Sequence, residues 1–134
     1  MAEQAFAEVL RSNPNHYRAL YNMGLVYEGR AVRAPAGAQR IRHWRTAVSW
    51  LERAYRSPQR SASGEHAFTI YNSLGMIYLG LGDLQQADRY LQEGYRHRGR
   101  LSDFSRGRLY GNLGYLDGLQ GDVRNARRFC TEGA

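Results

Sequence analysis

Side chains that act as acids, bases or metal ligands are thinly spread in this chain. It has four histidines, at His16, His43, His66 and His97. None belongs to an HExxH pair or to another spacing that places two imidazoles on one helix face. The only cysteine, Cys130, has no second thiolate for a disulfide or a cysteine-rich zinc site, so we expect a small core residue. The sequence predicts no catalytic residue, metal site or cofactor.

The acidic residues suggest solvation rather than catalysis. We expect four of them to be ordinary surface residues of helices: Glu8, Glu28, Glu52 and Glu93. The two Gly-Asp pairs, at 82–83 and 121–122, recur as turn signals and not as a phosphate-binding loop. We therefore expect a protein that binds and does not catalyse.

Arginine dominates the charge of the chain. All 19 basic residues are arginine against 12 acids, which gives a formal net charge of +7. Such a surface favours acidic partners, either carboxylate-rich peptides or polyanions such as RNA. Two clusters form a candidate secondary basic surface: Arg40, Arg42, Arg45, Arg96 and Arg98. Trp44 lies among the first three, but its place on an apolar stripe favours packing over stacking on a base.

Length and composition predict one elongated, soluble domain over residues 1–134. Hydrophobic residues make up 43% of the chain, and no apolar run is long enough to cross a bilayer. We expect no membrane insertion. The first residues lack the pattern of a secretory signal, so the cytoplasm is the default expectation.

Three segments of the chain are similar to one another. Residues 19–27, 70–78 and 109–117 each have a large apolar residue, then Met or Leu followed by Gly, at Gly24, Gly75 and Gly114. Glycine inside a helix costs about 1 kcal/mol relative to alanine. Three glycines in the same position therefore predict a close approach by another helix.

A second pair of segments follows the last two of these. Residues 82–94 and 121–133 both begin with Gly-Asp and continue with small or apolar residues at helical spacing. Glycine ends a helix in a left-handed conformation, and aspartate caps the next helix. The repeating unit is thus predicted to be a helical hairpin.

These segments resemble the tetratricopeptide repeat (TPR) family. The resemblance implies an all-α right-handed superhelix of about seven helices. Residues 1–13 would be an orphan second helix, and three hairpins would occupy 17–58, 63–98 and 102–134. In the third hairpin Asp117 replaces the Tyr that the family prefers.

The spacing of the repeats is irregular. The first unit carries an insertion at about 28–46, where we expect a loop over 29–37 and an early start of the second helix. Ser102 is placed to cap an early start of the third hairpin.

The resemblance also implies a concave groove lined by the first helix of each hairpin. It assigns ten groove residues to the binding of a protein or peptide: Arg18, Tyr21, Asn22, Leu25, Thr69, Asn72, Met76, Arg108, Asn112 and Tyr115. The expected function is a protein-interaction scaffold. Two alternatives stay open: an arginine-rich module that binds RNA or another polyanion, and self-association through apolar ends that no capping helix covers.

Overall fold

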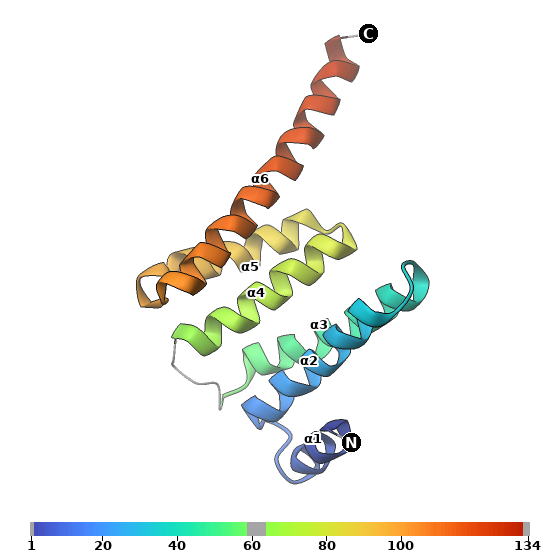
Figure 1. Ribbon diagram of the computed structural model, residues 1–134, viewed down its shortest axis with the longest axis vertical. Helices are drawn as coiled ribbons and strands as arrows, with labels where there is room; N and C mark the ends of the chain where they lie inside the picture. The colour runs from blue at the N-terminus through green and yellow to red at the C-terminus, as the bar shows by residue number, and fades with distance from the viewer. Residues whose placement is uncertain (1, 59–63, 133–134) are drawn as a thin grey trace.

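The computed structural model describes residues 2–58 and 64–132, and within these ranges it contains helices and no strand (Figure 1). The α-helices are α1 (Ala2–Ser12), α2 (Tyr17–Arg33), α3 (Ala38–Arg56), α4 (Gly64–Leu81), α5 (Leu84–Arg96) and α6 (Asp103–Glu132). A 3-10 turn, Arg98–Arg100, precedes α6. The all-α prediction is confirmed, with six α-helices in the described residues in place of about seven.

The helices form two layers. In Figure 1, α2, α4 and α6 lie in the nearer layer and α3 and α5 behind them, with α1 beside the start of α2. The most extensive helix contacts are those of α2 with α3 and of α4 with α5. Two antiparallel hairpins of the predicted kind are therefore present.

Two of the three repeated glycines, Gly24 and Gly75, let the two layers approach closely, as predicted. The prediction is wrong for Gly114, where an added methyl group would meet no atom of the described residues within 4 Å. A methyl group on Gly24 would lie 2.5 Å from Leu51 Cγ, and one on Gly75 would lie 2.8 Å from Leu91 Cγ. Both leucines are fully buried. Each glycine thus leaves room for a leucine of the paired helix, and the packing offsets the cost of glycine in a helix.

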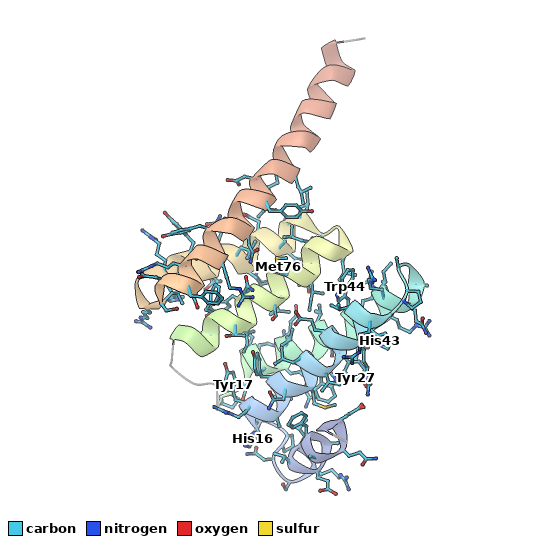
Figure 2. The ribbon with its side chains drawn as sticks, in the orientation of Figure 1. His16, Tyr17, Tyr27, His43, Trp44 and Met76 are labelled. Carbon is cyan, nitrogen blue, oxygen red and sulfur yellow. The ribbon has the colours of Figure 1, made fainter. Side chains whose placement is uncertain are left out.

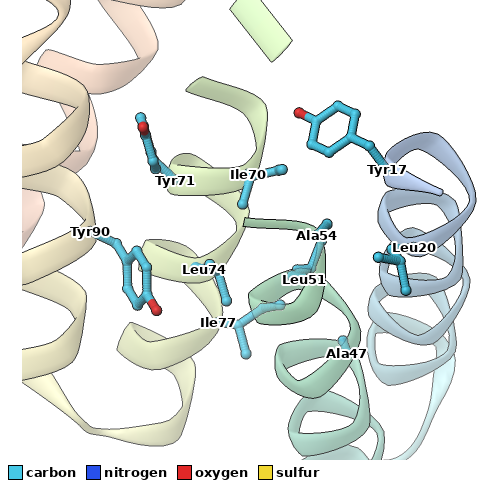
Figure 3. Packing of buried hydrophobic residues seen from close by; sticks show 10 residues of the cluster. All are labelled: Tyr17, Leu20, Ala47, Leu51, Ala54, Ile70, Tyr71, Leu74, Ile77 and Tyr90. Atoms are coloured by element: carbon cyan, nitrogen blue, oxygen red, sulfur yellow. The ribbon is translucent and has the colours of Figure 1, made fainter. Parts of the chain in front are cut away.

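The main core joins the first two hairpins (Figure 3). It contains Leu51 of α3 and Leu74 of α4, both without solvent exposure. Tyr55 holds the hairpins together through edge-on ring contacts with Tyr71 of α4 and Tyr90 of α5, at 5.5 and 5.9 Å between ring centroids. A second apolar cluster joins α4, α5 and α6 around Leu91 and Leu109.

The helices end and begin at residues that favour helix termination or N-capping. Gly82 has φ of +81° and ends α4, and the Asp83 carboxylate accepts the Gln86 N–H at 3.1 Å and caps α5. The Gly-Asp pair therefore makes the turn between the two helices. The Ser102 hydroxyl accepts the Ser105 N–H at 3.2 Å, which confirms the predicted cap of α6. His16 caps α2 in the same way through Nδ1, at 3.1 Å from Ala19 N.

The loop expected over residues 29–37 is shorter than predicted. α2 continues to Arg33, and α3 begins at Ala38. The buried side chain of Ala31 and the guanidinium of Arg40 explain the extension, because Arg40 donates to Ala31 O at 3.1 Å and to Ala34 O at 2.9 Å. These bonds satisfy carbonyls that the end of a helix leaves free.

The turn expected at Gly121-Asp122 is absent, so the prediction of a third hairpin over 102–134 is wrong for the described residues up to Glu132. The backbone is helical from Asp103 to Glu132, and Gly121 has no positive φ. Continuing the helix keeps every i to i−4 hydrogen bond, whereas a turn must be supported by packing of the returning helix. The same dipeptide therefore makes a turn after α4 and continues a helix in α6.

No helix within the described residues combines the length and the apolar character needed to cross a membrane.

Candidate functional site

Three helices present equivalent positions on the outer side of the nearer layer. α2, α4 and α6 each carry a residue directly after the repeated glycine: Leu25, Met76 and Tyr115. All three are large apolar side chains exposed to solvent, at 38%, 41% and 59%. Figure 2 shows Met76 on α4 in the middle of this layer. We call these three residues the apolar row.

A polar seam runs beside the apolar row. Asn112 of α6 donates through Nδ2 to Asn72 Oδ1 of α4. Asn72 is 4% exposed, so its amide serves to join α4 to α6 and is not open to a ligand. Of these two predicted groove residues, Asn112 alone retains solvent access.

The same seam continues between α2 and α4. Tyr21 hydrogen-bonds to Thr69, and Glu28 hydrogen-bonds to Ser73. Burial raises the pKa of the Glu28 carboxyl, an effect that the Ser73 hydrogen bond and the positive charge of Arg108 only partly oppose. The other oxygen, Oε2, is buried and has no hydrogen-bond partner in the part of the chain that the structure describes. The expectation that Glu28 is an ordinary solvated residue is therefore wrong.

A small cavity opens at the beginning of α2. Its volume is about 200 Å³, and its walls are Tyr17, Arg18, Tyr21, Asn22 and Thr69. Four of these five were predicted groove residues; Tyr17, which Figure 2 labels at the start of α2, was not. Arg18 is exposed here, and Arg108 is exposed on α6, so a guanidinium lies on the outer helices on each side of α4.

The arginines of the candidate basic surface have several intramolecular partners. Arg40 caps α2 as described above, and Arg96 pairs with Glu93 at 2.8 Å. Arg98 donates to Tyr95 O at 3.0 Å and lies over the Tyr95 ring at 4.1 Å. Arg42 and Arg45 are exposed on α3. The five residues thus do not act as one set of solvent-directed charges.

Trp44 packs, as its place on an apolar stripe predicted. A methyl group on Gly80 of α4 would meet the Trp44 ring at 2.6 Å, so the indole lies directly on this helix. Figure 2 places Trp44 beside the extended end of the α2–α3 hairpin.

Glu52 is the second carboxylate that sequence reasoning placed wrongly in solvent. Its Oε1 accepts hydrogen bonds from Tyr78 at 2.8 Å and from Tyr90 at 3.1 Å, and the two tyrosine rings stack at 5.9 Å. Burial and the neighbouring carboxylate raise the pKa of Tyr78, and they raise that of Tyr90 to about 12. The Glu52 carboxylate therefore joins α3, α4 and α5.

No three or more His, Cys, Asp or Glu side chains gather into a possible metal site in the part of the chain that the structure describes. The polar groups on the nearer layer are amides, hydroxyls and guanidiniums from three helices. They can bind a chain through its backbone and carboxylates.

Paired helices in two layers, with glycines at the contacts, define a helical-repeat protein. Residues 68–96, which cover most of α4 and all of α5, match the family model of the tetratricopeptide repeat. The match confirms the TPR resemblance in the second hairpin. Comparisons with curated proteins and with solved structures found no match.

Proposed function

We propose that this chain is a protein-interaction scaffold that binds an extended peptide segment across α2, α4 and α6. The tetratricopeptide match supports protein interaction in general. The apolar row supports this particular face, because three equivalent positions each present a large apolar side chain to solvent. Isolated exposed apolar residues are common, but a row that repeats with the fold favours a binding surface.

The spacing of the row suggests the form of the ligand. Packed helices lie about 8–10 Å apart, and a peptide in the polyproline II conformation advances about 3.1 Å per residue with three residues per turn. A segment that crosses the layer would therefore present apolar side chains about three residues apart to Leu25, Met76 and Tyr115.

The positive charge of the chain suggests which other groups the peptide carries beside its apolar side chains. The exposed guanidiniums of Arg18 and Arg108 favour carboxylates on the partner, and the net charge of +7 acts in the same direction at longer range. Asn22, Asn112 and the hydroxyl of Tyr21 supply donors and acceptors for a peptide backbone. The proposed partner is an acidic protein segment with spaced apolar residues.

Binding of RNA or another polyanion has weaker support. It needs several arginines directed to solvent together, whereas Arg40, Arg96 and Arg98 make contacts within the chain. Trp44, the aromatic residue nearest to the first cluster, packs on α4.

Affinity capture from a lysate of the source organism tests the proposal. The native chain should retain a protein at high salt, and a Leu25→Ser/Met76→Ser/Tyr115→Ser variant should lose it. An Arg42→Ser/Arg45→Ser variant is the matched control and should still retain that protein. Nucleic acid that salt releases equally from the native chain and the apolar-row variant would replace the proposal with polyanion binding.

A further inference from the structure

One face of α6 is uncovered where the corresponding faces of α2 and α4 are buried. Tyr110 occupies the position of Leu20 in α2 and Tyr71 in α4, four residues before the repeated glycine. Leu20 and Tyr71 are 1% and 4% exposed, whereas Tyr110 is 48% exposed. Gly114 is exposed too, while Gly24 and Gly75 are buried. Tyr110, Gly114 and Asp117 lie on this uncovered face at helical spacing.

The first two units show what covers such a face. In each, a leucine of the paired second helix fills the space that the glycine leaves, Leu51 at Gly24 and Leu91 at Gly75. A methyl group on Gly114 would meet no atom within 4 Å among the residues that the structure describes. The uncovered face therefore lacks the second helix that completes the other two units.

The chain contains the sequence of that missing helix. Residues 121–133 align with 82–94, and Cys130 occupies the position of Leu91. In the structure, however, residues 122–132 continue α6. At 1.5 Å per residue, the sixteen steps from Gly114 to Cys130 span about 24 Å, so Cys130 cannot reach Gly114 of its own continuous helix.

We propose that a second copy of this chain completes the third unit by exchange of the last part of α6. Two α6 helices would pair antiparallel about a twofold axis, each covering the uncovered face of the other with residues 122–132. Figure 1 shows the backbone of α6 extending beyond the other helices.

The register of this pairing is the one that the closed hairpins already use. It places Cys130 of the partner subunit at Gly114 and Ala126 of the partner subunit at Gly118, just as Leu91 faces Gly75 within the second unit. On the receiving face, Asp117 is exposed and stands where the resemblance leads us to expect tyrosine.

The exchange uses a different face from the proposed peptide site. Tyr115, the α6 member of the apolar row, lies about 100° around the helix from Gly114. A failed peptide-binding test would therefore leave the dimer untouched, and a monomeric chain would leave peptide binding untouched.

A cysteine introduced at Gly114 tests the pairing directly, because Cys130 is the only native cysteine. Under mild oxidation, the Gly114→Cys chain should form a disulfide-linked dimer whose crosslinked peptides join positions 114 and 130. An Arg108→Cys chain, with its new thiol about 120° around α6, should crosslink at least tenfold less. A disulfide within one chain would show that the hairpin closes on itself and would overturn the proposal. The absence of any 114–130 crosslink would also overturn it.

Light scattering with sedimentation gives a second readout without a covalent bond. The native chain should be a dimer, and Gly114→Leu should raise its dissociation constant at least tenfold, because the leucine fills the space meant for the partner. Arg108→Leu should leave the constant within twofold. Since a Cβ at position 114 would meet no atom of the described residues outside its own helical turn within 4 Å, the circular dichroism of the Gly114→Leu chain should stay helical. A monomeric native chain, or a dimer that Gly114→Leu leaves unchanged, would overturn the proposal.

Discussion

At the scale of single residues, partly buried carboxylates and closely packed glycines stabilise the contacts between helices. Glu52 illustrates the point, because one of its oxygens accepts the hydroxyl hydrogens of Tyr78 and Tyr90 from two different helices. Hydrogen bonds to a charged group contribute about 1.5–3 kcal/mol.

This cluster predicts a loss of stability in alkali. The unfolded chain releases its tyrosine protons near pH 10, whereas the fold raises the pKa of Tyr90 to about 12. The native state then binds more protons than the unfolded state, so the free energy of unfolding should fall as pH rises from about 10 to 12. Urea denaturation across this range measures the effect.

The Tyr90→Phe chain is the control for the alkaline loss. It removes one of the raised groups, so its free energy of unfolding should depend less on pH than that of the native chain. An equal pH dependence in both chains would show that Tyr90 does not contribute.

Replacing a glycine with alanine should lower stability where the glycine contacts another helix and raise it where the glycine faces open space. Gly24→Ala places a methyl group 2.5 Å from the fully buried Leu51, so we expect a net loss of about 1–2 kcal/mol from overpacking. The methyl group of Gly111→Ala meets no described atom within 4 Å, so this change should gain about 1 kcal/mol from helix propensity. Thermal denaturation of the two chains measures both changes. Equal effects of the same sign would show that the α2–α3 contact does not depend on Gly24.

At the scale of elements, the two Gly-Asp pairs behave differently in one chain. Gly82 has a left-handed φ of +81° and ends α4, while Gly121 lies inside α6. Alanine in the left-handed region costs about 1–2 kcal/mol. Gly82→Ala should therefore destabilise the fold by that amount.

Gly121→Ala should have the opposite effect, because alanine replaces glycine inside a helix at a gain of about 1 kcal/mol. Far-ultraviolet circular dichroism and urea denaturation measure the stability of both variants. Destabilisation by Gly121→Ala would indicate that the chain makes a turn at this position.

These elements show how far the sequence predicts the fold. The glycine register and the Gly82-Asp83 turn predict the second hairpin, because both signals are local and the packing agrees with them. The continuation of α6 was not predictable in the same way, since Gly121-Asp122 has the same local signal and the outcome depends on whether a partner helix supports the turn. The C-terminus of α2 was misjudged because the capping guanidinium, Arg40, lies on the next helix.

The candidate site was predictable where it follows the repeat. The positions after the repeated glycines identified Leu25, Met76 and Tyr115, and the structure exposes all three. The sequence did not predict the inward position of Glu28 or the bond that buries Asn72 against Asn112. Both depend on neighbours in other helices, which no periodicity within one helix specifies.

At the scale of the whole molecule, one helix layer supplies packing and the other presents the exposed side chains. The farther layer, α3 and α5, fills the spaces that glycines leave in the nearer layer, and this packing holds α2 and α4 in position. The nearer layer then aligns one exposed apolar side chain on each of three helices, between exposed arginines on the two outer ones. The proposed peptide binding should therefore have an apolar part that salt leaves intact and an ionic part that salt weakens.

The salt dependence of a captured partner should be moderate. Arg18→Ala should weaken binding by about threefold to tenfold at low salt and have less effect at high salt, because the exposed guanidinium is screened. Calorimetric titration with the partner at two ionic strengths measures this. A loss that stays equal at both strengths would contradict an ionic role for Arg18.

The most direct measurement places a photocrosslinking amino acid on each layer and asks which one captures the partner. Benzoylphenylalanine at position 76, in the apolar row, should crosslink to the retained protein. The same residue at position 89, exposed on α5 in the other layer, should not. Capture at 76 alone is the expected result, and capture at 89 without capture at 76 would contradict the assignment of the binding face to α2, α4 and α6.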